Sequence, residues 1–78
     1  MAQKDKILNK AKLNPGGLSF LEFQSLLSGF GWSKDRHKGS HEIWYSSTGD
    51  RMSIQNRHGT AKEYQVKQFL KYLQEVRQ

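Results

Sequence analysis

A histidine follows a glycine-serine turn and a dense basic run in the segment KDRHKGSH, which spans residues 34–41. Gly39 lets the backbone turn tightly at little steric cost. His41 carries the side chain type that gains or loses a proton near neutral pH, and the basic run before it can hold a phosphate. The segment therefore has the residue types that cleavage of a phosphodiester without a metal requires, although so short a string also occurs by chance.

Length and charge restrict the class of protein. The chain has 78 residues, 13 Lys and Arg against seven Asp and Glu, and a formal net charge of +6. A domain this small buries only about 60% of its extended-chain surface, which leaves no room for a cofactor domain or a deep substrate cavity. The basic surplus favours an anionic partner, most commonly nucleic acid, whereas the alternative is a basic protein that is merely soluble.

The numbers of cysteines and histidines indicate whether disulfides or metal sites are to be expected. The absence of cysteine excludes disulfides and thiolate metal sites. His37, His41 and His58 are too poorly supported by spacing and by other ligands to predict a zinc site, so we expect no metal and no cofactor. His58 is either a second proton carrier or a loop histidine without a role. No apolar run approaches the ~20 residues of a membrane span or forms a signal-type core, and we therefore expect a cytoplasmic protein.

Helical patterns occur at both ends of the chain. A short helix is expected over residues 4–13, followed by a break over 14–17 that contains proline and two glycines. The capping-box spacing occurs twice, in Ser19 with Glu22 and in Thr60 with Glu63. The apolar stripes that follow are Phe20, Phe23, Leu26, Leu27 and Phe30 in the first case and Val66, Phe69, Leu70, Leu73 and Val76 in the second.

Strand patterns fill the middle of the chain. Residues 32–36, 42–46 and 51–55 are the expected strands, with turn residues at 47–50 and a loop at 56–59. Such short connections favour an antiparallel meander. The predicted fold is α+β, in the order α-β-β-β-α, with two helices on one face of a three-stranded antiparallel sheet and a short helix in front. The other face must meet water or a partner.

Strand alternation leaves two arrangements open around the histidine. His41, Ile43 and Tyr45 share one face of their strand, and Trp44 lies on the other. In the first arrangement Ile43 is in the core, a bulge turns His41 outward, and Trp44 lies on the open face. In the second, Trp44 is in the core and His41 shares the open face with Ile43. We expect the first.

The segment 20–45 resembles the HicA toxin family, the RNA-cleaving half of HicA–HicB toxin–antitoxin pairs. The motifs that carry the resemblance are Gly31-Trp32, Asp35-Arg36, Lys38-Gly39-Ser40-His41 and the tail at 61–70. The resemblance extends over about residues 18–78 and implies a fold like that of double-stranded-RNA-binding domains. It also implies an mRNA-cleaving ribonuclease with His41 as the catalytic residue, and a HicB-like antitoxin that covers the His41 face. Residues 1–17 resemble an N-terminal extension and linker, and 18–78 the RNA-binding and cleaving domain.

RNA cleavage by transesterification needs proton transfer and positive charge at the phosphate. We assign proton transfer to His41, although a structural strand histidine is the competing interpretation. Glu42 beside it either repels substrate phosphates or tunes the histidine. An exposed Trp44 would stack on an unpaired base, or be covered by the antitoxin or the extension. The residues expected to bind RNA or its phosphates are Lys34, Arg36, Lys38, Gly39, Ser40, Trp44, Arg57 and Lys62.

Two other functions remain open at this point. A non-catalytic RNA-binding module of the same fold would use phosphate and 2′-hydroxyl contacts without cleavage, and substitution of His41 by alanine would separate it from the toxin. A protein-interaction domain would show binding that barely responds to salt, unlike phosphate-driven binding.

Overall fold

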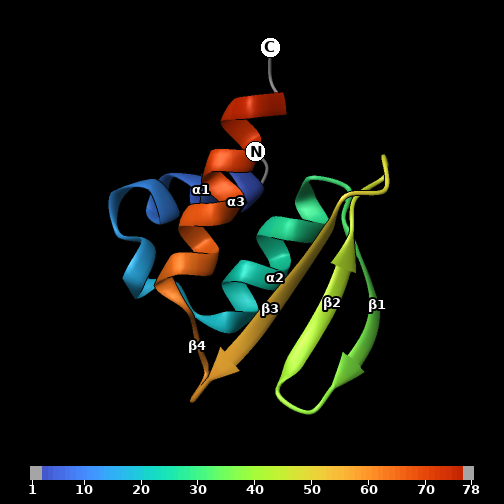
Figure 1. Ribbon diagram of the computed structural model, residues 1–78. Coiled ribbons are helices and arrows are strands. Elements are labelled where there is room, and N and C mark those ends of the chain that lie inside the picture. Colours follow the sequence, from blue (N-terminus) through green and yellow to red (C-terminus); the bar gives the residue numbers. More distant parts are fainter. Residues whose placement is uncertain (1–2, 77–78) are drawn as a thin grey trace.

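The computed structural model describes residues 3–76, and over this range the chain forms three α-helices, a 3-10 turn and four strands (Figure 1). The elements are α1 (Gln3–Leu13), η1 (Pro15–Gly17), α2 (Phe20–Gly29), β1 (Ser33–Lys38), β2 (His41–Tyr45), β3 (Arg51–Arg57), β4 (Thr60–Ala61) and α3 (Glu63–Val76). The strands form one antiparallel sheet in the order β1-β2-β3-β4. The predicted α+β class is confirmed, and the sheet has one strand more than expected. No described helix is long and apolar enough to cross a membrane.

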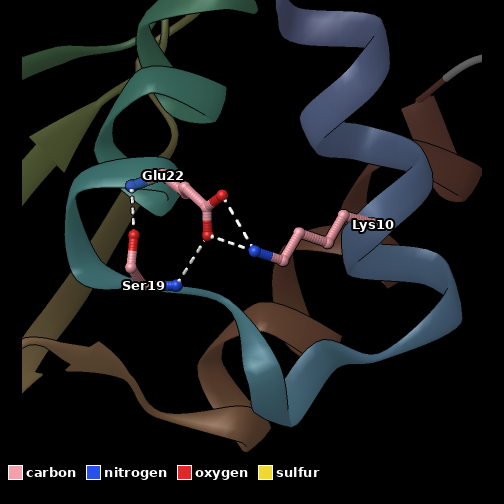
Figure 2. A network of polar contacts seen from close by, with 3 residues as sticks. All are labelled: Lys10, Ser19 and Glu22. Atoms are coloured by element: carbon pink, nitrogen blue, oxygen red, sulfur yellow. Dashed lines mark hydrogen bonds and ion pairs between the residues drawn. The ribbon is translucent and has the colours of Figure 1, made fainter.

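The capping box at the start of α2 is confirmed and extended by an ion pair. Ser19 Oγ accepts from the Glu22 amide at 3.0 Å, and Glu22 Oε1 accepts from the Ser19 amide at 3.0 Å. Lys10 Nζ donates to both Glu22 oxygens at 2.9 Å (Figure 2). The backbone N–H of Ser19, and then Lys10, hold the pKa of Glu22 below its ordinary value. The same carboxylate therefore caps α2 and fastens α1 to it.

The second expected capping box is wrong. Thr60 pairs with Arg57 in the β3–β4 ladder, and α3 begins only at Glu63. A two-residue turn joins the two strands, in which His58 and Gly59 have positive φ angles of 55° and 85°. This turn folds residues 60–61 back onto β3, so that Thr60 becomes part of the sheet instead of a helix cap.

The turn between β2 and β3 has the chemistry expected of it. Asp50 Oδ2 accepts from Thr48 Oγ1 at 3.0 Å and from the Tyr72 hydroxyl of α3 at 2.7 Å. These hydrogen bonds, first that of Tyr72, lower the pKa of Asp50. The turn is thereby attached to the last helix.

The core lies between the helices and one face of the sheet. Its sheet residues are Trp44, Met52, Ile54 and Ala61, and Ile7, Leu8 and Ala11 join it from α1. Phe69 of α3 makes edge-to-face contacts with Phe23 at 6.1 Å and with Trp32 at 5.9 Å between ring centroids. The expected apolar stripes of both long helices supply most of the rest, except that the side chain of Val76 lies outside those described.

The preferred assignment of the faces of β2 is wrong, and the second arrangement is the observed one. Trp44 lies opposite Met52 on the helix-covered face and is 5% exposed. Its indole Nε1 donates to Glu42 Oε1 at 3.1 Å, and Gln24 Nε2 of α2 donates to the same oxygen at 2.7 Å. Because these donors satisfy the carboxylate, Glu42 can be buried beside Trp44. The bulge occurs in β1, between Lys34 and Arg36, and not at His41.

Candidate nucleic-acid interface

The hairpin that presents His41 is made by the two-residue turn Gly39–Ser40 between β1 and β2. Lys38 and His41 pair directly across it. Gly39 has a φ of +62°, and a Cβ at this position would meet no atom within 4 Å. The left-handed conformation, and not lack of space, therefore favours glycine here. His41 is the first residue of β2, and its side chain is exposed.

Ser40 fixes this turn to β3. Its carbonyl accepts from the Asn56 amide at 3.2 Å, and its Oγ accepts from Gln55 Nε2 at 3.4 Å. Since Gln55 is also the register partner of His41, the turn and the histidine are held by the same part of β3.

The face of the sheet that carries His41 is basic. Directly opposed residues of antiparallel strands share a face, which places Arg36 opposite Ile43, Lys38 opposite His41 and Arg51 opposite Tyr45. Because alternate residues of a strand share a face, Arg57 of β3 lies on the same face as Arg51. We call this surface the open face; its described strand residues are Ser33, Arg36, Lys38, His41, Ile43, Tyr45, Arg51, Ser53, Gln55 and Arg57. At its border Arg36 Nε lies 3.0 Å from the carboxylate of Asp35, the residue at the β1 bulge. The open face has the charge that a phosphate backbone requires.

A hollow of ≈340 Å³ lies beside His41, between the strands and α3. Its lining residues are His41, Arg51, Met52, Ser53, Tyr64, Gln65 and Gln68. Gln65 sets the position of α3, because its Oε1 accepts from the Gln55 amide at 2.8 Å on the edge of β3 that β2 does not cover. The helix thus forms one wall of a hollow whose other wall is the open face.

Lys34 and Glu42 are not brought to this face. Lys34 lies opposite Trp44, and its Nζ is 3.9 Å from Glu42 Oε2. The β1 bulge thus places Lys34 on the other face from Arg36 and Lys38, and its expected long-range contact with the phosphate stays a prediction. The Glu42 carboxylate points toward α2 and faces neither the histidine nor a phosphate bound beside it.

The other two histidines lie apart from His41. His37 is opposite Glu42 and so belongs to the other face of β1. His58 lies in the β3–β4 turn and lines a separate hollow of ≈330 Å³ together with Arg57 and Lys62. His58 is therefore not placed to act as a second proton carrier for His41. Within residues 3–76 no group of three or more His, Cys, Asp or Glu is arranged to hold a metal ion.

Arg57, at the end of β3, and Lys62, directly before α3, are brought together in the structure. Both line the second hollow. The Lys62 ammonium also lies over the ring of Tyr64, 5.8 Å from its centroid, and Tyr64 lines the hollow beside His41. Lys62 thus lies between the two hollows, although Glu63 adds a carboxylate to the lining of the second.

Of the residues that line the hollow beside His41, the sequence analysis named only His41 as a site residue; it missed Arg51, Met52, Ser53, Tyr64, Gln65 and Gln68. Strand alternation places Arg51 on the same face of β3 as Ser53, Gln55 and Arg57. Its place on the same sheet face as His41 follows only from the register of β2 with β3. Tyr64 had a signal of its own: it is an aromatic residue outside the apolar stripe of α3, and it is 61% exposed. A single exposed aromatic residue is common on protein surfaces, so this signal alone did not mark a site.

Comparison with known proteins identifies the family. The family model described as HicA toxin of bacterial toxin-antitoxin matches residues 21–74, more than half of the chain. The match includes the His41 hairpin, the open face and most of α3, and it leaves α1 outside. The search of curated proteins and the search of solved structures gave no match. The chain therefore belongs to the HicA toxin family, and it is the toxin of a bacterial toxin–antitoxin pair.

Proposed function

We propose that this protein is an endoribonuclease that cleaves mRNA with His41 and thereby inhibits translation and growth. Members of the HicA toxin family are mRNA interferases. The observation that carries the proposal is the exposure of His41 on a face with four cationic side chains, of which Arg36 is paired with the Asp35 carboxylate at 3.0 Å and Lys38, Arg51 and Arg57 have no described ion pair. An imidazole in these surroundings meets a phosphodiester without electrostatic repulsion.

The proposed reaction is a transesterification. His41 takes the proton of a ribose 2′-hydroxyl, the 2′-oxygen bonds to phosphorus, and the bond to the 5′-oxygen breaks. The leaving oxygen takes a proton from water, so that the products are a 2′,3′-cyclic phosphate and a 5′-hydroxyl. Arg36 and Lys38 stabilise the charge on the pentacoordinate phosphate, and a positioned histidine contributes about 10²–10⁴-fold to the rate. None of these steps requires a metal ion.

The RNA strand is proposed to run across the open face toward the start of α3. Gly39 and Ser40 let the backbone of the turn approach the phosphate next to His41. Arg57 and Lys62 extend the positive surface to the N-terminus of α3, where free amides favour anions.

The antitoxin partner is proposed to be a HicB-like protein that covers the His41 face. A partner with acidic side chains would neutralise the open face and exclude RNA from it. The segment 1–17 is proposed to be a structural extension, because α1 packs on the helices at a distance from β1 and β2 (Figure 1). Its removal would expose core residues without altering the open face.

The test compares His41→Ala with His37→Ala, which removes an exposed histidine from the other face of the neighbouring strand. Each purified variant is incubated with labelled RNA in the presence of a chelator. We expect His41→Ala to bind RNA without cutting it, and His37→Ala to produce cyclic-phosphate ends at the wild-type rate. Equal cleavage by His41→Ala removes His41 from the mechanism. Binding by the wild type without any cleavage shows the non-catalytic RNA-binding module instead.

A further inference from the structure

We propose that the hollow beside His41 binds one base of the RNA next to the cleaved phosphate, with the base stacked on Tyr64 and its edge contacted by Gln68. The inference rests on the proposed function, and it makes Tyr64 and Gln68 specificity-determining residues. Four features of the hollow support it: the placement of Tyr64, the charge over its ring, the unpaired polar groups around it and its size.

Tyr64 is held in place by a chain of hydrogen bonds that begins at the register partner of His41. The Gln55 amide donates to Gln65 Oε1 at 2.8 Å, and Gln65 Nε2 donates to the Tyr64 hydroxyl at 3.3 Å. Gln65 is 4% exposed, so this connection is fixed inside the protein. The phenol therefore has a defined position in the wall of the hollow that His41 also lines.

The exposed ring of Tyr64 is suited to stacking on a base. It remains 61% exposed although it is anchored at its hydroxyl. The Lys62 ammonium lies over the ring, which restrains it and adds a cation close to the path of the backbone. Unpaired bases stack on exposed aromatic side chains regardless of their sequence. Tyr64 thus supplies affinity for a base but little discrimination between bases.

Discrimination requires polar groups that are free to meet the edge of the base. Arg51, Ser53 and Gln68 line the hollow, and in the described part of the chain their side chains have no hydrogen-bond or ion-pair partner. The Gln68 amide offers both a donor and an acceptor, whereas Arg51 offers donors alone. An amide of this kind can form paired hydrogen bonds with the edge of a splayed base.

The size of the hollow limits what it can hold. Its ≈340 Å³ is near the lower end of the ~300–1,000 Å³ typical of small-ligand sites. It has room for a single unstacked base and not for a base-paired helix. The substrate class that follows is RNA that is single-stranded at the point of cleavage.

The binding test uses the full chain with His41→Ala, so that the RNA stays intact, and measures the affinity for a short single-stranded RNA at fixed salt. Adding Tyr64→Leu is expected to weaken binding about tenfold, while Tyr64→Phe retains most of the affinity. The control Leu21→Ala, which removes an exposed apolar side chain from α2 outside the open face, should not have this effect. An unchanged affinity with Tyr64→Leu overturns the inference, and so does an equal loss with Tyr64→Phe. Thermal melting of each variant identifies any loss caused by unfolding.

The cleavage test uses enzymes with an intact His41 on RNA of randomised sequence, and the fragment ends are sequenced. Gln68→Ala is expected to reduce the base preference at one position beside the cut while cleavage continues. The matched control Gln74→Ala, which removes the same kind of side chain from α3 at a separate hollow beside α1, should leave that preference unchanged. A wild-type preference that Gln68→Ala does not alter overturns the role of Gln68. If the His41→Ala chain binds no RNA and the wild type cuts none, the proposed function itself fails, which is a different outcome from either of these.

Discussion

The cations of the open face allow a quantitative prediction of how RNA affinity depends on salt concentration. Each phosphate contact to single-stranded nucleic acid contributes about −0.7 to the slope of log affinity against log salt concentration. Arg36, Lys38, Arg51 and Arg57 supply four cations on this face, and Arg36 must exchange its ion pair with Asp35 to meet a phosphate. If all four meet phosphates, the slope is about −2.8. Affinity then falls about 50-fold between roughly 50 and 200 mM salt.

A pair of lysines on β1 turns this estimate into a test of the structure. Lys38 lies opposite His41 on the open face, whereas Lys34 lies opposite Trp44 and is paired with Glu42. We expect Lys38→Gln to reduce the slope by about 0.7. We expect Lys34→Gln to leave it unchanged, although the two substitutions remove the same charge from the same strand.

Fluorescence anisotropy of a labelled single-stranded RNA, titrated with the His41→Ala chain over a series of salt concentrations, measures both slopes. Measurement of the slope separates phosphate contacts from a general change in affinity, because loss of a contact alters the dependence on salt and not only the value at one concentration. Equal effects of Lys34→Gln and Lys38→Gln would refute the assignment of the two faces. A slope near zero for the parent would show that binding is not driven by phosphates.

Three further predictions concern stability. The Ser19 amide, and then Lys10, hold the pKa of Glu22 below its ordinary value of about 4.5. Near this pH the folded state therefore binds fewer protons than the unfolded chain, so the free energy of unfolding should fall as the pH drops below about 4.5. Urea titrations at several pH values should show a weaker fall for Glu22→Gln. Gly39→Ala should destabilise by about 1–2 kcal/mol because of the positive φ and lower the melting temperature by several degrees, with Gly39→Asn closer to wild type. Trp44→Phe should cost about 1–3 kcal/mol in calorimetry, because it removes a donor from the buried Glu42 carboxylate; a neutral effect would contradict the hydrogen bond at 3.1 Å.

The parts of the fold that could be predicted are those that depend on neighbouring residues. The Ser19–Glu22 capping box, the glycine turn before His41 and the apolar stripe of α3 each lie within a few positions of one another. Thr60 shows the limit of this approach. The spacing of Thr60 to Glu63 also fits a helix cap. In the structure, however, Thr60 pairs with Arg57 across a tight turn and so belongs to the sheet.

The candidate site was predictable in its centre and not in its surroundings. His41 and the cations beside it stand close together in the sequence, so they could be grouped without a structure. Alternation separates Trp44 from Ile43 but does not say which of them meets the helices. That choice depends on Gln24 of α2, which gives the buried Glu42 a partner. Tyr64 joins the site only through the contact of α3 with β3, between residues far apart in the chain.

The outer strand β1 has a consequence for how the protein adapts to a ligand. All six of its side chains are exposed, so it adds nothing to the apolar core and is paired along one edge alone. Segments with few buried contacts open at a lower free-energy cost than the rest of a domain, and amide hydrogen exchange should be fastest in the sheet at this strand. Arg36 and Lys38 thus lie on the strand of the sheet with the lowest expected local stability. They can therefore adjust to successive phosphates while β2 holds His41 in a fixed position.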